Sequence, residues 1–337
     1  MVFLFFVLAA CWNIKKVEEK ELIQIDLITG FLGSGKTTFL KEYVGYLLSQ
    51  GEKVGIIEND FGAINIDMLI LQDLVGENCE LEQIVGGSVV TDWKRRFKAK
   101  LISMAMCGYT RILVEPSGIF DVDAFFDMLY DEPLDRWYTV GNIFAIVDAK
   151  LEKDLSRQAQ YLLTSQIAKA GAIVLSRVQE ATKEEMEATK KYIGETLRSF
   201  HCDREINDAF YTKRWDELGE KDWEKLKMVG WKRADHEKLW FEHKDAFQSL
   251  FILDKHFSQE HLVDIVKKIF ASDAYGNVFR VKGFVNVSGT SEPEWIELNA
   301  TREKVSIEHH EKGQDVIILI GENMNETLIL QAFEQAS

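Results

Sequence analysis

The chain of 337 residues is long enough for two domains, each with its own hydrophobic core. Hydrophobic residues make up 46% and charged residues 28%, the proportions of an ordinary globular protein. The net charge of −15 gives the surface a field that repels nucleic acid and anionic lipid, so we expect neither a nucleic-acid nor a membrane partner. The 4 cysteines lack paired spacing, which suggests neither a disulfide framework nor a CxxC metal site and favours free thiols in a reducing cytosol.

Residues 1–20 are left out of the predicted fold. The apolar start ends in Leu8-Ala9-Ala10-Cys11, which looks like a bacterial lipobox. However, no Lys or Arg precedes Lys15, and the apolar run is too short to span a bilayer. A tail or a mis-assigned start codon fits better, and we expect a cytoplasmic protein.

A phosphate-binding loop follows the first predicted strand. Residues 22–28 are mostly apolar and predict a strand that ends at Thr29, and residues 30–38 read Gly-Phe-Leu-Gly-Ser-Gly-Lys-Thr-Thr. Apolar residues at helical spacing come next, so backbone N–H groups at the start of a helix can cradle a β-phosphate. Lys36 would reach the β- and γ-phosphates and the Thr37 hydroxyl would hold Mg²⁺. The nucleotide-binding residues predicted from this loop are Gly30, Gly33, Ser34, Gly35, Lys36, Thr37 and Thr38.

Strand-like and helical segments alternate along the first two hundred residues and predict an α/β fold, a P-loop NTPase domain with a mostly parallel sheet. We expect further strands at 53–58, 111–115, 142–148 and 170–176, and helices at 93–107 and 182–200. Residues 247–253, 278–287 and 316–320 are strand-like and alternate with helices at 259–271 and 326–336, which predicts a smaller α+β domain. The predicted boundaries are 1–20 for the tail, 21–202 for the NTPase domain, 203–245 for a charged, Trp-rich insert or linker, and 246–337 for the C-terminal domain.

Acidic residues at the ends of two strands are candidates for the phosphate chemistry. The strand 111–115 delivers Glu115 to the Mg²⁺ region, and Gly118 has a backbone N–H that could meet the γ-phosphate. We therefore predict Lys36 and Glu115 as catalytic residues, and Thr37 and Glu115 as Mg²⁺ ligands. Asp60 follows the second strand.

The phosphate loop, the Asn-Asp-Phe-Gly segment from Asn59 and the Glu115-Pro-Ser-Gly turn together resemble the CobW-type P-loop GTPases, a family associated with metallocentre assembly and metal delivery. The resemblance continues at residues 146–149, 166–170, 279–284 and 320–324 and covers most of the chain from about residue 22. It implies GTP hydrolysis with Mg²⁺ and a client metalloprotein or enzyme as partner. It also implies that the segment from Asn59 is a nucleotide-sensing switch, with Asp60 and Asp67 sensing Mg²⁺ or the partner. On this resemblance Asp60 joins the predicted catalytic residues and Mg²⁺ ligands. The sequence sets no oligomeric state.

The chain departs from the family at its metal-binding motif. A Cys-x-Cys-Cys sequence should fall at residues 87–90, which here are Gly-Ser-Val-Val and offer no thiolate for Zn²⁺ or Cu⁺. An oxygen-rich site for a harder ion remains open, built from Glu58, Asp60, Asp67 and Glu82.

The second departure concerns the base. Guanine is usually read by Asn-Lys-x-Asp, whose carboxylate accepts hydrogen bonds from N1–H and the exocyclic amine of the base. Here Ser176-Arg177-Val178-Gln179 stands at that place. An amide has one acceptor and one donor group, so Gln179 suits adenine as well or better. We predict base contacts from Ser176, Arg177 and Gln179, with GTP favoured by the resemblance and ATP as the alternative.

Other features leave more than one interpretation open. His309-His310-Glu311 is either a metal-handling patch or a solvated strand end, because adjacent side chains on a strand point to opposite faces. The tryptophans between 215 and 240 form either a partner surface or the packing of an insert onto the domain. A small-molecule kinase and a nucleotide-gated binding protein without metal delivery are the alternatives to an NTP-hydrolysing switch.

Overall fold

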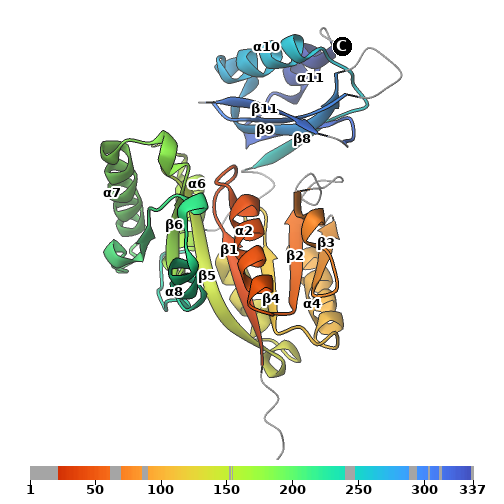
Figure 1. The fold of residues 1–337 in the computed structure, drawn as a ribbon. Helices are drawn as coiled ribbons and strands as arrows, with labels where there is room; N and C mark the ends of the chain where they lie inside the picture. Colours follow the sequence, from red (N-terminus) through yellow and green to blue (C-terminus); the bar gives the residue numbers. More distant parts are fainter. Residues whose placement is uncertain are drawn as a thin grey trace, which may run out of the picture.

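The computed structural model describes residues 22–60, 70–85, 90–151, 153, 155–239, 247–287, 294–302, 304–310 and 313–334. The predicted tail, residues 1–20, lies outside them. Two sheets organise the chain: a seven-stranded sheet formed before residue 212, and a five-stranded sheet formed after residue 247. In Figure 1 the second sheet, with its two helices, sits at the end of the first sheet where the phosphate loop lies. The predicted α/β domain and smaller α+β domain are therefore both confirmed.

The first sheet has the strand order β3-β2-β4-β1-β5-β6-β7, and all these pairings are parallel. Central strands read as nearly unbroken apolar runs because helices cover both faces. The second strand extends two residues beyond its predicted end and so includes Asn59 and Asp60. The strands are β1 (Ile23–Thr29), β2 (Val54–Asp60), β3 (Cys79–Val85), β4 (Arg111–Glu115), β5 (Tyr138–Asp148), β6 (Ala172–Ser176) and β7 (Phe210–Tyr211).

The helices of this domain divide between the two faces of the sheet. Helices α2 and α8 share one apolar cluster with the sheet, and α4, α5, α6 and α7 share the other. Thr182 starts α7 with a capping box, in which its side chain and that of Glu185 bond each other's backbone N–H groups. The helices are α2 (Lys36–Ser49), α4 (Val90–Met104), α5 (Val122–Leu129), α6 (Arg157–Ala168), α7 (Lys183–Ser199) and α8 (Glu220–Lys227).

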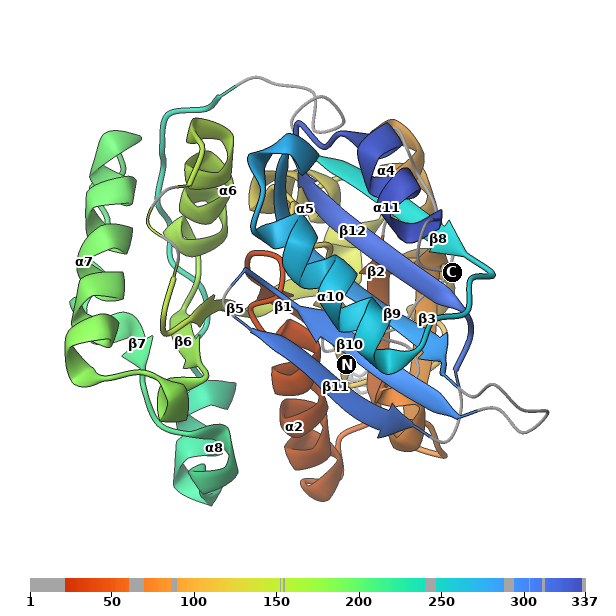
Figure 2. The ribbon, with the colours of Figure 1, turned by 90° about the horizontal axis from the view of Figure 1, so that it is seen from above.

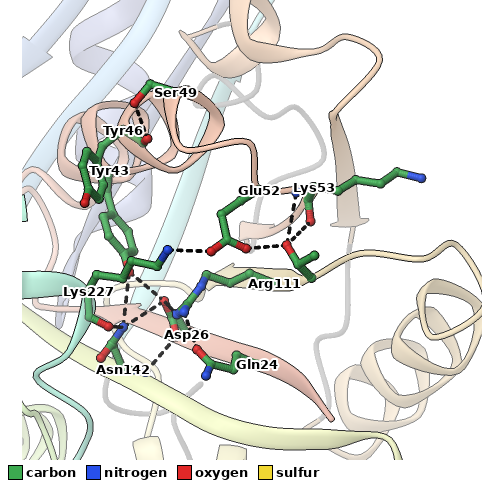
Figure 3. Close-up of polar contacts among 11 residues, drawn as sticks. Gln24, Asp26, Tyr43, Tyr46, Ser49, Glu52, Lys53, Arg111, Asn142 and Lys227 are labelled. Carbon is green, nitrogen blue, oxygen red and sulfur yellow. Dashed lines mark hydrogen bonds and ion pairs between the residues drawn. The ribbon is translucent and has the colours of Figure 1, made fainter. Parts of the chain in front are cut away.

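A buried polar network fixes α2 to the sheet (Figure 3). The Asp26 carboxylate is fully buried in β1 and forms an ion pair with Arg111 of β4, with 2.6 Å between Oδ2 and Nη1. It also accepts a hydrogen bond from the Tyr43 hydroxyl on α2, at 3.1 Å, and one from the Asn142 backbone N–H on β5, at 2.7 Å. Because α2 begins at Lys36, this network also holds the phosphate loop in place.

The described part of the Trp-rich stretch packs against the first domain. Strand β7 extends the large sheet beside β6. Trp223 on α8 is buried, and its ring stacks on Tyr43 and Tyr46 with centroid separations of 6.0 and 5.9 Å. Trp231 contacts Phe126 on the opposite face of the sheet at 4.9 Å. The structure thus favours the packing interpretation for these tryptophans, whereas Trp240 lies outside the described residues.

The second sheet is antiparallel, with the order β11-β10-β9-β12-β8. Helices α10 and α11 cover one of its faces, and Figure 2 shows the other face lying over the phosphate loop. In the described residues no helix is both long and apolar enough to cross a membrane. The elements are β8 (Gln248–Leu253), α10 (Gln259–Phe270), β9 (Asn277–Asn286), β10 (Trp295–Ala300), β11 (Val305–His310), β12 (Val316–Glu322) and α11 (Glu326–Glu334).

Candidate functional site

The phosphate loop lies between the end of β1 and the start of α2, as the sequence predicts. Gly30, Gly33 and Gly35 have φ angles of 148°, 77° and 92°, a region that side-chain-bearing residues rarely adopt. At Gly30 space is limiting as well, because an added Cβ would lie 2.2 Å from the Ile146 carbonyl oxygen. The loop therefore requires these glycines for its backbone shape. Its N–H groups then lie at the positive end of α2.

A hydroxyl and a carboxylate meet beside the loop. Thr37 Oγ1 on α2 donates a hydrogen bond of 2.8 Å to Glu115 Oε1 at the end of β4. Glu58 lies next to Glu115 in the register of β2 and β4, and both residues are buried. Hard oxygen ligands of this kind suit Mg²⁺, and a hydroxyl that donates its proton to Glu115 keeps lone pairs for a cation. The donor set therefore fits the predicted Mg²⁺ site.

Glu58 was not among the predicted catalytic or Mg²⁺-binding residues, although it belonged to the proposed oxygen-rich site. Of that site's other members, Glu82 pairs in register with Ile57, so it points to the opposite face from Glu58. Its carboxylate forms an ion pair with Lys100 at 2.8 Å. Asp67 and the side chain of Asp60 lie outside the described residues. Among the described residues, Glu58 is therefore the member of the proposed oxygen-rich site that lies beside Glu115, the partner of Thr37.

A cavity of about 670 Å³ opens from the phosphate loop. It brings together residues from five separate segments of the first domain. Several of these segments lie at the carboxyl ends of parallel strands, which meet at one edge of the sheet. The predicted site residues that line it are Gly33, Gly35, Lys36, Thr37, Thr38, Glu115, Ser176, Arg177 and Gln179. Trp215 also lines it, a residue that sequence reasoning placed only in the Trp-rich stretch.

Apart from Asp60, whose side chain lies outside the described residues, three predicted residues are not in the lining of this cavity. Gly30 is covered by β5, and Ser34 is buried and borders a smaller cavity of about 150 Å³. Gly118 packs so closely on the loop that an added Cβ would lie 2.6 Å from the Leu32 backbone nitrogen. Its carbonyl accepts a hydrogen bond from Gln166 Nε2 at 3.0 Å, which ties the turn to α6. Contact of Gly118 with a γ-phosphate stays a prediction.

The predicted base-reading segment connects directly to the phosphate loop. Arg177 follows β6 in a left-handed conformation with φ of 51°. Its Nη2 donates to the Gly33 carbonyl oxygen at 2.9 Å, and its Nη1 forms an ion pair with Asp148. The guanidinium therefore bridges the two loops at the rim of the cavity. Gln179 lies in the short turn Val178–Glu180 and lines the cavity too.

The C-terminal sheet supplies the remaining wall of the cavity. Alternate residues on β9, β10 and β11 point toward the first domain, and none of them was predicted to bind the nucleotide. His310 is on this wall against the ring of Phe284, at 5.1 Å, whereas His309 is exposed with its Nδ1 3.5 Å from Glu294. The two histidines thus point to opposite faces, as expected for a strand. The wall residues are Arg280, Lys282, Glu297, Asn299, Glu308 and His310.

Comparison with family models decides the family. The model of the CobW/HypB/UreG nucleotide-binding domain matches residues 24–201, and that of the cobalamin synthesis protein cobW C-terminal domain matches residues 248–337. The chain belongs to the CobW/HypB/UreG family. It therefore contains the family's nucleotide-binding domain, which carries the phosphate loop described above.

Relatives of this chain include bacterial and eukaryotic proteins. It is 27% identical over 172 residues to the zinc chaperone YeiR of Escherichia coli, and this alignment covers 51% of each chain. It is 24% identical over 318 residues to zinc-regulated GTPase metalloprotein activator 1 of Dictyostelium discoideum, covering 82% of this chain and 66% of that one. The Zn(II)-bound YjiA GTPase from E. coli aligns with 94% of this chain and 99% of its own at 20% identity, with a TM-score of 0.38. The chain matches about half the length of YeiR.

The metal-binding motif typical of CobW proteins has no thiolate here. The motif would fall at residues 87–90, of which 87–89 lie outside the described residues. Within the described residues, no group of three or more His, Cys, Asp or Glu side chains is placed to hold a metal ion. Cys79 and Cys107 do not converge on the nucleotide site. Cys79 is in register with Val54 at the start of β2, and the Cys107 carbonyl accepts from Lys53 Nζ at 2.8 Å, so both lie at the amino end of the sheet.

Proposed function

We propose that this protein binds and hydrolyses a purine nucleoside triphosphate, and that hydrolysis switches its interaction with a metal centre or a client metalloprotein. GTP is the first choice and ATP the second. The contact between Thr37 and Glu115 beside a glycine-shaped loop is the observation that carries this proposal. Relatives named as GTPases and zinc chaperones support it. A cytoplasmic location follows from the need for cytosolic nucleotide.

Each part of the site has an assigned task. The backbone N–H groups between Gly33 and Thr37 bind the β-phosphate, and Lys36 bridges the β- and γ-phosphates. Thr37 and Glu115 would hold Mg²⁺, which neutralises charge on the phosphate oxygens. Asp60, at the end of β2, remains our candidate for positioning the ion or the attacking water.

Base selection is assigned to the segment after β6. Arg177 is positioned by its bonds to Asp148 and Gly33, so its side chain can cover one face of a purine ring. Gln179 would meet the polar edge of the base. Because its amide offers one acceptor and one donor group, we expect weaker guanine selectivity than a carboxylate at this position would give.

A second candidate is a nucleotide-gated binding protein that delivers no metal. The sequence Gly-Ser-Val-Val at residues 87–90, where relatives of CobW type have thiolates, specifically favours it. Both candidates need a bound nucleotide, and they differ in whether a metal ion accompanies the client.

Lys36→Ala tests the common part of the proposal. Loss of a charge-assisted phosphate contact costs about 1.5–3 kcal/mol, a tenfold or larger loss of NTP affinity. Lys191→Ala, a change at an exposed helix position, is the control. Release of free phosphate by the wild type supports the NTPase, and a phosphorylated metabolite would instead identify a kinase. Equal affinity and turnover in wild type and Lys36→Ala would refute the proposed site.

A further inference from the structure

We propose that Arg280 of the C-terminal domain contacts the terminal phosphate of the bound nucleoside triphosphate, so that the phosphate site is completed within one chain by its second domain. The inference rests on the proposed function and adds a residue outside the nucleotide-binding domain.

The placement of Arg280 follows from strand periodicity. In the segment Phe-Arg-Val-Lys-Gly-Phe, residues 279–284, Val281 packs in the core beneath α10 and α11. Arg280 and Lys282 therefore point to the opposite face, and both line the nucleotide cavity. Figure 2 shows β9 passing close to the loop between β1 and α2.

Arg280 lies directly over the phosphate loop. A methyl group placed on Gly33 would be 3.5 Å from Arg280 Cδ and 3.7 Å from its Nε. Gly33 is one of the residues whose N–H groups face the phosphates. The guanidinium is thus within reach of phosphate oxygens bound by the same loop, and its planar set of donors matches a phosphate group.

The charge of Arg280 is available for a ligand. Other cations of the cavity are engaged, since Arg177, Arg214 and Lys41 form ion pairs with Asp148, Asp216 and Asp73. Within the described part of the chain, by contrast, Arg280 has no carboxylate within ion-pair distance. Its Nε donates to a neutral partner, Asn299 Oδ1, at 3.3 Å.

The acidic residues of the same wall lie further along the sheet. Glu297 is in register with Phe284, four residues from Arg280, and Glu308 pairs with Glu297. At about 3.3 Å per residue, this places them about 13 Å along the strand. The end of the wall above Gly33 therefore presents positive charge to a phosphate.

Contacts between the domains hold Arg280 in this position. Phe31 of the phosphate loop packs against Phe279 with a centroid separation of 5.7 Å. Outside the cavity lining, Lys304 forms an ion pair of 2.8 Å with Glu180. Since docking involves the loop itself, loss of the γ-phosphate would remove one of the interactions that keep the domains together.

The test compares Arg280→Gln with wild type in binding of a non-hydrolysable GTP analogue and of GDP, both with Mg²⁺. We expect Arg280→Gln to lower affinity for the analogue about ten- to hundredfold, the effect of one charge-assisted hydrogen bond. Affinity for GDP should change less than about threefold, so the preference for triphosphate falls. Arg280→Lys should restore part of the preference because it keeps the charge.

Lys304→Gln is the matched control, because it removes a cation and an interdomain contact away from the cavity. It should leave the preference for triphosphate unchanged, and thermal melting of each variant confirms that it is folded. An unchanged preference in Arg280→Gln would overturn the inference and leave the proposed function standing, as would an equal loss in Lys304→Gln. Absence of nucleotide binding by the wild type would overturn both.

Discussion

The buried ion pair of β1 and β4 offers the sharpest test of how the nucleotide domain is held together. Asp26 is fully buried and Arg111 is 6% exposed in its side chain. We predict that Asp26→Asn, which keeps the shape but removes the charge, destabilises this domain severely. Burial alone would lower the pKa of Arg111, but Asp26, Tyr43 and Glu52 together raise it above its ordinary value. A guanidinium is not deprotonated in proteins, so Arg111 keeps its charge when Asp26 is replaced.

The expected magnitude follows from what the substitution leaves behind. A buried pair that loses one partner costs about 3–5 kcal/mol, because the other charge stays in a medium that solvates it poorly. The Asn142 N–H and the Tyr43 hydroxyl also donate to Asp26, so part of their geometry is lost as well (Figure 3). The double variant Asp26→Asn with Arg111→Met removes both charges, so it should recover part of the free energy of unfolding that Asp26→Asn loses.

Urea unfolding followed by tryptophan fluorescence measures this effect, since Trp223 reports the packing of α8 on α2. The control is Glu132→Gln, which breaks an exposed pair with Arg136 and should cost at most about 1 kcal/mol. A loss below about 1 kcal/mol for Asp26→Asn would refute the reasoning, because a desolvated Arg111 could not then be present.

Two further predictions concern the base and pH. Gln179→Asp should shift nucleotide preference toward GTP by about tenfold or more, the value of one charge-assisted hydrogen bond, in competition titrations with GTP and ATP; a strong wild-type GTP preference that survives changes at Gln179 would show that the base is read elsewhere. Burial lowers the pKa of His236 below its ordinary value of 6.5, so on acidification the unfolded chain binds a proton that the folded protein excludes. Stability should therefore fall as the pH drops below about 6.5, and urea midpoints at several pH values should show a shallower fall for His236→Gln.

Local sequence predicted the phosphate loop and its flanking elements because their determinants are close along the chain. Glycines at fixed spacing define the loop, and the apolar periodicity of β1 and α2 changes within a few residues. Glu115 was predicted for the same reason, since an unbroken apolar strand delivers it. Strand β3 was missed because it lies at the edge of the sheet and alternates acidic residues with apolar ones at its start.

The rest of the site depends on contacts that no local pattern encodes. Glu58 comes beside Glu115 only through the register of β2 and β4. Trp215 reaches the cavity because β7 joins the sheet, and Arg280 because the second domain docks on the loop. Hydrophobic alternation would have indicated which side of β9 carries Arg280, but not what that side faces.

Zinc is the point at which the family and the residues of this chain differ most. A structural thiolate site binds zinc with about 10–16 kcal/mol. We expect a Kd for Zn²⁺ no tighter than about 1 μM, equivalent to about −8 kcal/mol, with or without GTP. Burial raises the pKa of the Cys79 thiol to about 11, which disfavours the thiolate that a metal needs. Cys107 is exposed but lies at the amino end of the sheet, away from Thr37 and Glu115.

Equilibrium dialysis against a competing chelator measures this affinity, with Cys202→Ser as a control for the loss of a buried thiol. Sub-micromolar binding that disappears in Cys79→Ser or Cys107→Ser would contradict the prediction, because it would require these thiols to form a site. It would then favour metal delivery over the nucleotide-gated binding protein. Weak binding in every variant would instead favour a switch that keeps the family's nucleotide chemistry without a thiolate-bound metal, since a fold can retain one function and lose another.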